Sequence, residues 1–134
     1  MIVNFTIPGE PKAKARPRVT KKGIAYTPKE TTEYENWVRQ CYVTGNQGKI
    51  LKGQIKVIIN AYFSIPKSTS QKKQKEMKNF LLRPTKKPDT DNIAKIVLDS
   101  LNKIAFDDDK QVIDLRVLKF YSENPRVEVT LDEI

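Results

Sequence analysis

Residues 87–103 read KPDTDNIAKIVLDSLNK, and the spacing of their apolar side chains predicts a helix over residues 91–103. One face of this helix is apolar and suits a buried position. It carries Ile93, Ile96, Val97, Leu101 and Ile104. At about 100° per residue, the opposite face is polar. It carries Asp91, Lys95, Asp99 and Asn102.

The segments around this helix alternate between strand and helix patterns. Residues 54–65 and 111–121 are rich in β-branched and aromatic side chains, and residues 2–7 and 126–131 alternate between polar and apolar. The segment 54–65 is expected to be the longest and most buried strand. A helix is predicted over about 28–44, after Thr27-Pro28, with Tyr34, Trp37 and Cys41 on its core face.

Two basic elements complete the pattern, a hairpin over 19–26 and a short helix over 70–82 that is expected to form a surface lid or arm. The order is strand, basic hairpin, helix, strand, two helices and two strands. It predicts a single mixed α/β (α+β) domain over residues 1–134, in which helices pack on a mixed β-sheet.

Composition removes whole classes of chemistry. The chain has 134 residues, no histidine and one cysteine, Cys41, which excludes histidine-based triads, disulfides within the chain, and zinc or iron–sulfur sites built on cysteine. An enzyme of this composition works with carboxylates, lysines, hydroxyls or a metal held by oxygen. No apolar run approaches the roughly 18 residues of a membrane span, and residues 1–8 are too short and polar for a signal peptide. We therefore expect a cytoplasmic protein with no membrane partner.

The charges are segregated along the chain. Lysine and arginine number 25 against 16 acids, a net charge of +9, which favours a polyanionic partner such as nucleic acid. The basic residues concentrate in segments 12–22 and 67–87, whereas six of the eight aspartates lie between residues 89 and 109. Like charges held close together repel, and a bound cation is the simplest way to offset that cost. The alternative is a solvated acidic loop.

The aspartates suggest a metal-dependent reaction on a phosphodiester. Asp89 and Asp91 alternate in a stretch predicted to be extended, which places both carboxylates on one side. Whether Asp108 or Asp109 returns to this pair depends on the fold. If one does, three carboxylates meet in a pocket that suits Mg²⁺ or Mn²⁺, and Lys95 lies near enough to stabilise charge in the transition state.

Each of these residues also has a structural interpretation. Asp91 is a possible helix N-cap, and Lys95 fits an ion-pair ladder with Asp91 and Asp99. Asp99 is better explained as an ion-pair partner than as a metal ligand. Gln111 suits the start of a strand as well as a site.

The motifs of residues 87–112 resemble those of the RusA family of Holliday junction resolvases. The family pattern is D-x-D-N-x-x-K, then an Asp-x-Leu, then D-D-x-Q-V at the next strand, and the opening PGEPKAKARPR also matches. The matching residues are Asp89, Asp91, Asn92, Lys95, Asp99, Leu101, Asp108, Asp109, Gln111 and Val112.

The resemblance implies a RusA-like fold and an Mg²⁺-dependent endodeoxyribonuclease, with Mn²⁺ as a substitute and no small-molecule cofactor. It also implies a two-fold homodimer that binds a four-way DNA junction and nicks two opposing strands. The family's essential carboxylates carry over to Asp89, Asp91 and Asp109, and its essential lysine to Lys95. The spacing from Asp99 to Gln111 is one residue shorter than in the best-known member, so the choice of Asp109 over Asp108 rests on alignment to Gln111.

The basic segments are expected to hold the phosphate backbone. The predicted DNA-binding residues are Lys12, Lys14, Arg16, Arg18, Lys72, Lys73, Lys75, Lys86 and Lys87. Two other functions remain open: a metal-dependent nuclease for flaps or other branched nucleic acid, and a non-catalytic DNA-binding accessory protein whose acidic residues are structural.

Overall fold

Four strands form the central sheet of the computed structural model, which describes residues 1–134. They are β1 (Ile2–Pro8), β4 (Ile55–Ser64), β5 (Val112–Ser122) and β6 (Arg126–Glu133), in the order β1-β6-β4-β5. β4 pairs parallel with β5, whereas β6 pairs antiparallel with both β1 and β4. The predicted mixed sheet is confirmed. The expectation that residues 54–65 form the longest strand is wrong, because β5 has 11 residues and β4 has 10.

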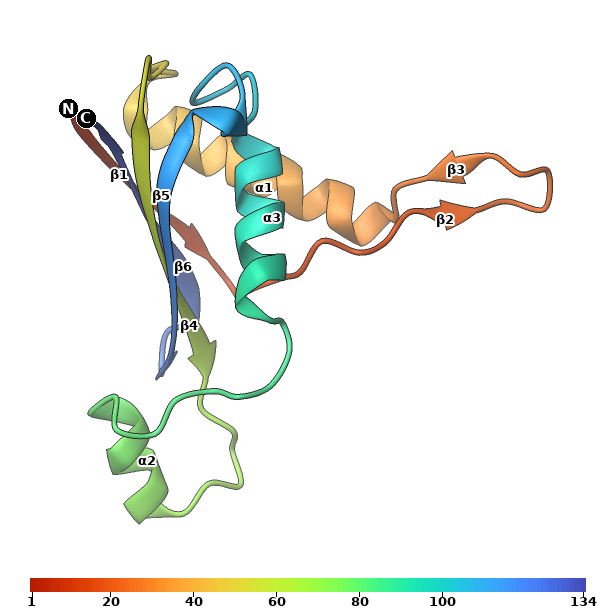
Figure 1. The fold of residues 1–134 in the computed structure, drawn as a ribbon. Coiled ribbons are helices and arrows are strands. Elements are labelled where there is room, and N and C mark those ends of the chain that lie inside the picture. Colours follow the sequence, from red (N-terminus) through yellow and green to blue (C-terminus); the bar gives the residue numbers. More distant parts are fainter.

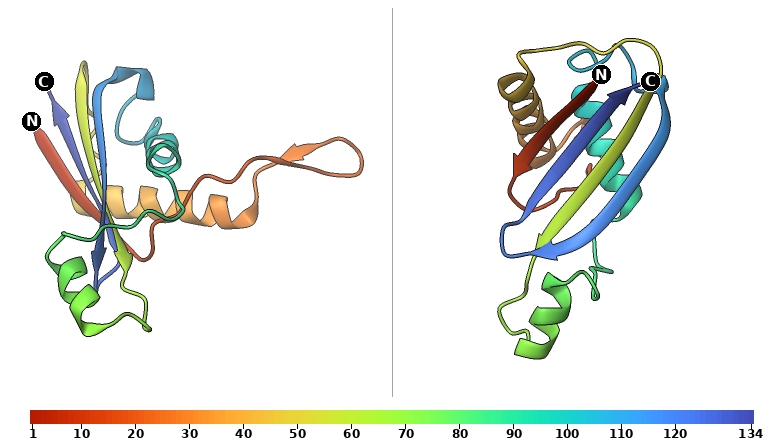
Figure 2. Two further views of the ribbon diagram at one scale, coloured as in Figure 1. Left: turned by 60° about the horizontal axis from the view of Figure 1, so that its bottom comes forward. Right: turned by 90° about the vertical axis from the view of Figure 1, so that its left-hand side faces the viewer.

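Both large helices lie on one face of this sheet, and the other face is open (Figures 1 and 2). The helices are α1 (Lys29–Asn46) and α3 (Thr90–Leu101). β1, β4 and β6 each alternate between buried and more exposed residues, so every second side chain points under the helices. The core is one cluster of buried apolar side chains between the sheet and the helices, as expected of a small α+β domain.

Helix α1 begins one residue and ends two residues later than predicted, and two of its predicted core side chains are not buried. Tyr34 and Val38 are buried as the apolar spacing indicates, but Trp37 is 38% exposed and Cys41 is only half-buried. The indole Nε1 of Trp37 donates to the carbonyl of Pro8 at 2.9 Å. The prediction that Trp37 belongs to the core is therefore wrong, because this ring lies over the outer strand β1 at the edge of the sheet.

Helix α3 is the predicted helix, shifted by one or two residues. Its buried face includes Ile93, Ile96 and Leu101, as predicted. The N-cap position belongs to Asp89, and Asp91 lies in the first turn. The interpretation of Asp91 as the N-cap is therefore wrong. The side chain of Asp89 makes no capping hydrogen bond.

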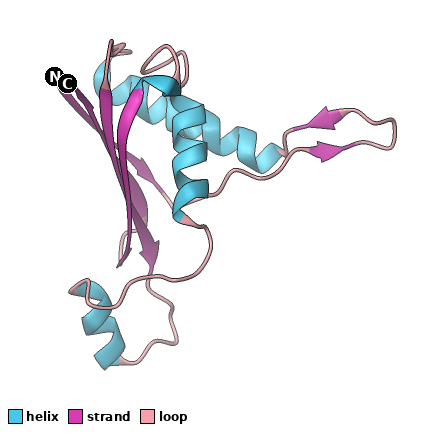
Figure 3. Ribbon diagram, in the orientation of Figure 1, coloured by secondary structure: helices cyan, strands magenta, loops and turns pink.

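Two basic elements project from the layered core (Figures 1 and 3). One is the predicted hairpin, formed by β2 (Arg18–Val19) and β3 (Ala25–Tyr26). The other is α2 (Gln71–Lys78), which is shorter than the predicted 70–82 because Phe80 adopts a left-handed conformation, with φ of 62°. No helix in the chain has both the length and the apolar character needed to cross a membrane.

Candidate active site

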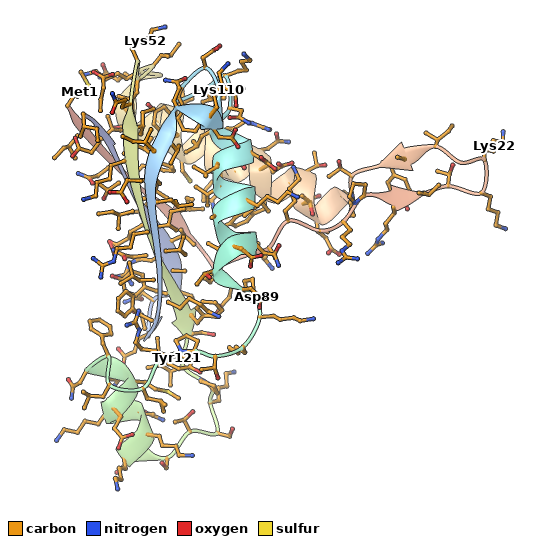
Figure 4. The ribbon with its side chains drawn as sticks, viewed as in Figure 1. Met1, Lys22, Lys52, Asp89, Lys110 and Tyr121 are labelled. Carbon is orange, nitrogen blue, oxygen red and sulfur yellow. The ribbon has the colours of Figure 1, made fainter.

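The aspartates form two groups at opposite ends of α3. Asp89 precedes the first turn, whereas Asp108 and Asp109 lie at a short 3-10 helix (Asp109–Gln111) beyond the last turn. Figure 4 labels Asp89 and Lys110 at these two ends. A 12-residue helix is about 18 Å long. The pocket of three carboxylates is not assembled within one chain, in which no group of three acidic side chains is placed to hold a metal ion.

Asp89 and Asp91 face different hollows. Asp89 lines one hollow with Lys12 and Arg16, and Asp91 lines another with Leu115. The extended stretch that was expected to carry both carboxylates ends between them, because Asp89 is extended at the N-cap and Asp91 lies in the first turn of α3. No salt bridge involves either residue, and both are exposed near the positive end of the α3 dipole. Their oxygens are therefore free to bind a cation.

Gln111 holds the second aspartate group in place. Its Oε1 accepts from the backbone N–H of Asp107 at 2.9 Å and of Asp108 at 3.1 Å. Its Nε2 donates to the carbonyl of Gly53 at 3.1 Å. Asp108 completes this capping box by accepting from the N–H of Lys110 at 3.2 Å. Gln111 thus ties the loop to the segment before β4, a role that the sequence left open.

Asp108 and Asp109 differ in what their carboxyl groups do. The hydrogen bond with Asp109, and after it the bond from the N–H of Lys110 that Asp108 accepts as the cap of the 3-10 helix, lowers the pKa of the Asp108 carboxyl. The same contact with Asp108, followed by partial burial and the negative charge of Asp99, raises the pKa of Asp109. Two carboxyl groups in contact favour a bound cation, and Asp109 has the carboxylate that the cap does not use.

Lys14 is the centre of an internal ion network, so it is not a free DNA-binding residue as predicted. Its Nζ lies 2.9 Å from the carboxylate of Asp99 and 3.2 Å from that of Glu35, which is only 8% exposed. Burial is the largest single effect on the pKa of Lys14 and lowers it. The hydrogen bonds and negative charges of Asp99 and Glu35 together outweigh burial, so the pKa is raised. Asp99 is an ion-pair partner, as expected. The predicted ladder is absent, since Lys95 forms no salt bridge.

We expect Lys14→Met to lower the free energy of unfolding by about 2 kcal/mol, because it leaves the buried Glu35 without its charged hydrogen-bond partner. Urea unfolding followed by circular dichroism measures this change. Lys12→Met is the matched control, since Lys12 is exposed, lies on the same segment and has no salt bridge. If both variants were as stable as wild type, the ion network would contribute nothing to the free energy of unfolding.

The other predicted DNA-binding residues are all exposed, and three of them surround Asp89. Lys12, Arg16 and Lys87 line the same hollow of about 660 Å³ as Asp89. The others predicted to bind DNA lie on the two projections and on the loop before α3. They are Arg18, Lys72, Lys73, Lys75 and Lys86.

Lys119 is a site residue that the sequence did not reveal. Burial lowers the pKa of its amine, and the negative charge of Asp89 opposes that effect. Its Nζ donates to the carbonyl of Lys86 at 2.5 Å, and this contact holds the loop before α3 against β5. Nothing in the strand pattern of residues 111–121 distinguishes this lysine, since its proximity to Asp89 depends on how β5 and α3 pack.

Comparison with known proteins connects this arrangement to a family. The family model described as "Endodeoxyribonuclease RusA" matches residues 8–132 of the chain. The chain belongs to the RusA family. The match spans both projections and both aspartate groups, and it confirms the resemblance carried by the sequence motifs.

A protein of Bacillus subtilis (strain 168) named "Uncharacterized protein YqaN" is 40% identical over 137 aligned residues. The alignment covers 98% of this chain and 96% of that protein. As a RusA family member, the chain is an endodeoxyribonuclease. The exposed carboxylates of α3 and the basic side chains around Asp89 are the candidate site for that activity.

Proposed function

We propose that the chain is a Mg²⁺-dependent endonuclease that resolves four-way DNA junctions as a homodimer by paired symmetric nicks. The observation that carries this proposal is the unpaired, exposed Asp89 in a hollow with Lys12, Arg16 and Lys87, within a RusA family chain. A carboxylate among basic side chains can hold a cation where these side chains hold a phosphate.

The donor chemistry fits magnesium. Asp89, Asp91 and Asp109 offer carboxylate oxygens, the ligands that this hard cation takes. Asp109 is favoured over Asp108, whose carboxylate caps the 3-10 helix. Magnesium bound to these residues supplies Lewis-acid stabilisation of phosphate charge and activation of a water molecule.

The other residues of the site bind and orient the DNA. Lys12, Arg16 and Lys87 would hold the phosphates that flank the scissile bond, since all three line the hollow of Asp89. Lys95 lies one turn after Asp91, is exposed and has no ion-pair partner, so its ammonium is available to stabilise negative charge in the transition state.

The separation of the aspartates supports the dimer. Asp89 and Asp109 of one chain lie at opposite ends of α3, a helix about 18 Å long, whereas the ligands of one ion lie within about 2 Å of it. A two-fold axis that sets two α3 helices antiparallel would bring Asp89 of one chain near Asp109 of the other. Strand β5 borders α3 at the edge of the sheet and exposes Ile113 and Leu115, apolar side chains that suit such a contact.

Cleavage of a synthetic four-way junction tests the proposal, with flap and linear duplex DNA as controls and Mg²⁺ present or absent. We expect paired nicks at symmetric positions on the junction alone, lost without the metal. Equal cutting of all three substrates would favour a general branched-DNA nuclease. Tight junction binding without cutting in Mg²⁺ or Mn²⁺ would favour the accessory protein.

A further inference from the structure

The hairpin is the distal part of an arm that projects away from the protein core (Figure 1). We call residues 16–27 the N-terminal arm. All 12 of these residues are exposed, and the arm extends away from the sheet and helices (Figures 1 and 2). Lys22 marks its tip in Figure 4. The apolar side chains of Val19, Ile24 and Tyr26 are 65%, 61% and 46% exposed, so folding of the chain alone does not bury them.

The turn at the tip of the arm has a defined shape. The N–H of Thr20 donates to the carbonyl of Ile24 and the N–H of Gly23 to that of Thr20, both at 2.9 Å. The hydroxyl of Thr20 accepts from the N–H of Ile24 at 3.1 Å, and Gly23 supplies the positive φ of 80°. A hairpin this short is marginally stable in water by itself. The hydrogen bonds of the turn therefore favour the hairpin conformation, which a binding partner would stabilise further.

The two faces of the ribbon differ. Arg18 lies opposite Tyr26, and Thr20 pairs with Ile24 two residues further on, so these four side chains project to one face. We call it the Arg18–Tyr26 face. The other face carries Val19 opposite Ala25. Only the Arg18–Tyr26 face combines a cation, an aromatic ring, an aliphatic side chain and a hydroxyl.

Both ends of the arm are anchored beside the candidate active site. On one side, Lys14 bridges Glu35 and Asp99, and the N–H of Ala15 donates to Thr31 Oγ1 at 3.2 Å. On the other side, Pro28 is buried at the start of α1. Arg16, where the arm begins, lines the hollow of Asp89. A bound DNA strand at Asp89 would therefore lie directly beside the base of the arm.

We propose that the N-terminal arm enters the major groove of the duplex that flanks the cleavage site, with its Arg18–Tyr26 face against the base edges. This inference rests on the proposed function. Each strand of the arm reaches about 15–20 Å, and the two strands lie about 5 Å apart. The major groove is about 12 Å wide and 8.5 Å deep, and it admits a two-stranded ribbon.

The charge of the arm favours DNA over a protein surface. No acidic residue occurs between Glu10 and Glu30, whereas the arm itself carries Arg16, Arg18, Lys21 and Lys22. The two lysines lie at the turn, where they can reach the phosphates that border a groove. A second copy of this chain, with net charge +9, would repel this tip.

Binding of the double variant Ile24→Ser/Tyr26→Ser to a four-way junction and to a linear duplex tests the inference. Fluorescence anisotropy in EDTA measures affinity without cleavage, and Val19→Ser is the matched control on the other face of the ribbon. We expect the double variant to lose affinity by about 10- to 100-fold for both DNAs, because two apolar side chains no longer leave water on binding. We expect Val19→Ser to change affinity by no more than about twofold. Wild type should also protect flanking guanine N7 atoms from methylation, and the double variant should not.

The possible failures are distinguishable. If wild type binds DNA and the double variant binds it equally, the arm does not contact the groove and the inference is wrong, while the proposed function stands. If wild type binds neither DNA, the proposed function fails and the inference fails with it. If the double variant changes the molar mass measured by light scattering, the arm contacts a second copy instead, which also overturns the inference. Unchanged thermal unfolding of both variants confirms that the fold is intact.

Discussion

The variant Asp89→Asn should not cleave a four-way junction, yet it should bind the junction at least as tightly as wild type does. Asparagine keeps the size of the side chain but removes the negative charge that attracts a cation. We expect the cleavage rate to fall by at least about a thousandfold, which corresponds to the several kcal/mol of transition-state stabilisation that a metal ion supplies. Affinity should hold or rise, because a negative charge disappears from a hollow lined by Lys12, Arg16 and Lys87.

Single-turnover cleavage and junction binding by the same preparation measure both effects. Asp132→Asn is the matched control, because Asp132 lies on β6 and pairs with Ile2 at the far side of the sheet. The fold should be unaffected, since Asp89 makes no capping hydrogen bond that asparagine would disturb. Cleavage at the wild-type rate by Asp89→Asn would remove this carboxylate from the proposed site and support the accessory-protein function.

Mixing two inactive variants should restore cleavage. In a dimer whose sites each combine Asp89 of one chain with Asp109 of the other, a mixed dimer of Asp89→Asn and Asp109→Asn chains has one fully wild-type site and one doubly altered site. After random exchange, about half of the dimers are mixed, so about a quarter of the wild-type sites return. Because each mixed dimer has one working site, the products should be single nicks rather than paired ones.

The mixture of Asp89→Asn with Asp91→Asn is the control. Both residues lie at the N-terminal end of α3, so they would belong to the same half of a shared site and the mixture should stay inactive. Each mixture is exchanged in mild denaturant, refolded, and assayed on a junction labelled on all strands. No activity from Asp89→Asn with Asp109→Asn, despite co-purification of differently tagged chains that shows mixed dimers, would mean that each site belongs to a single chain.

The local elements were predictable because their signals are local. The apolar side chains of residues 93–101 recur at helical spacing, and α3 buries them as that spacing predicts. The hairpin follows from Gly23 in a basic turn between two short extended segments, and it is confirmed. The prediction that Trp37 is buried is wrong because helical spacing identifies the apolar face of a helix but not how much of that face the sheet covers. At the edge of the sheet this ring stays partly exposed.

The candidate site was predictable in its residue types but not in its arrangement. The aspartates, the lysines and the absence of histidine pointed to a metal held by oxygen near a phosphodiester. The sequence could not show that Lys14 is bound between Glu35 and Asp99, because these residues lie 21 and 85 positions further along the chain. Lys119 near Asp89 was missed for the same reason.

The sequence by itself determined the elements, the mixed α+β class, the RusA family and the chemical types of the site. These properties depend on periodicity, charge and motif spacing, which can be read from residues that lie close together in the sequence. Only the tertiary structure decided that Asp89 and Asp91 face different hollows and that Asp109 lies at the far end of α3. The physical reason is that side-chain direction depends on where a helix begins and on what packs against it. Both are set by contacts between segments far apart in the chain.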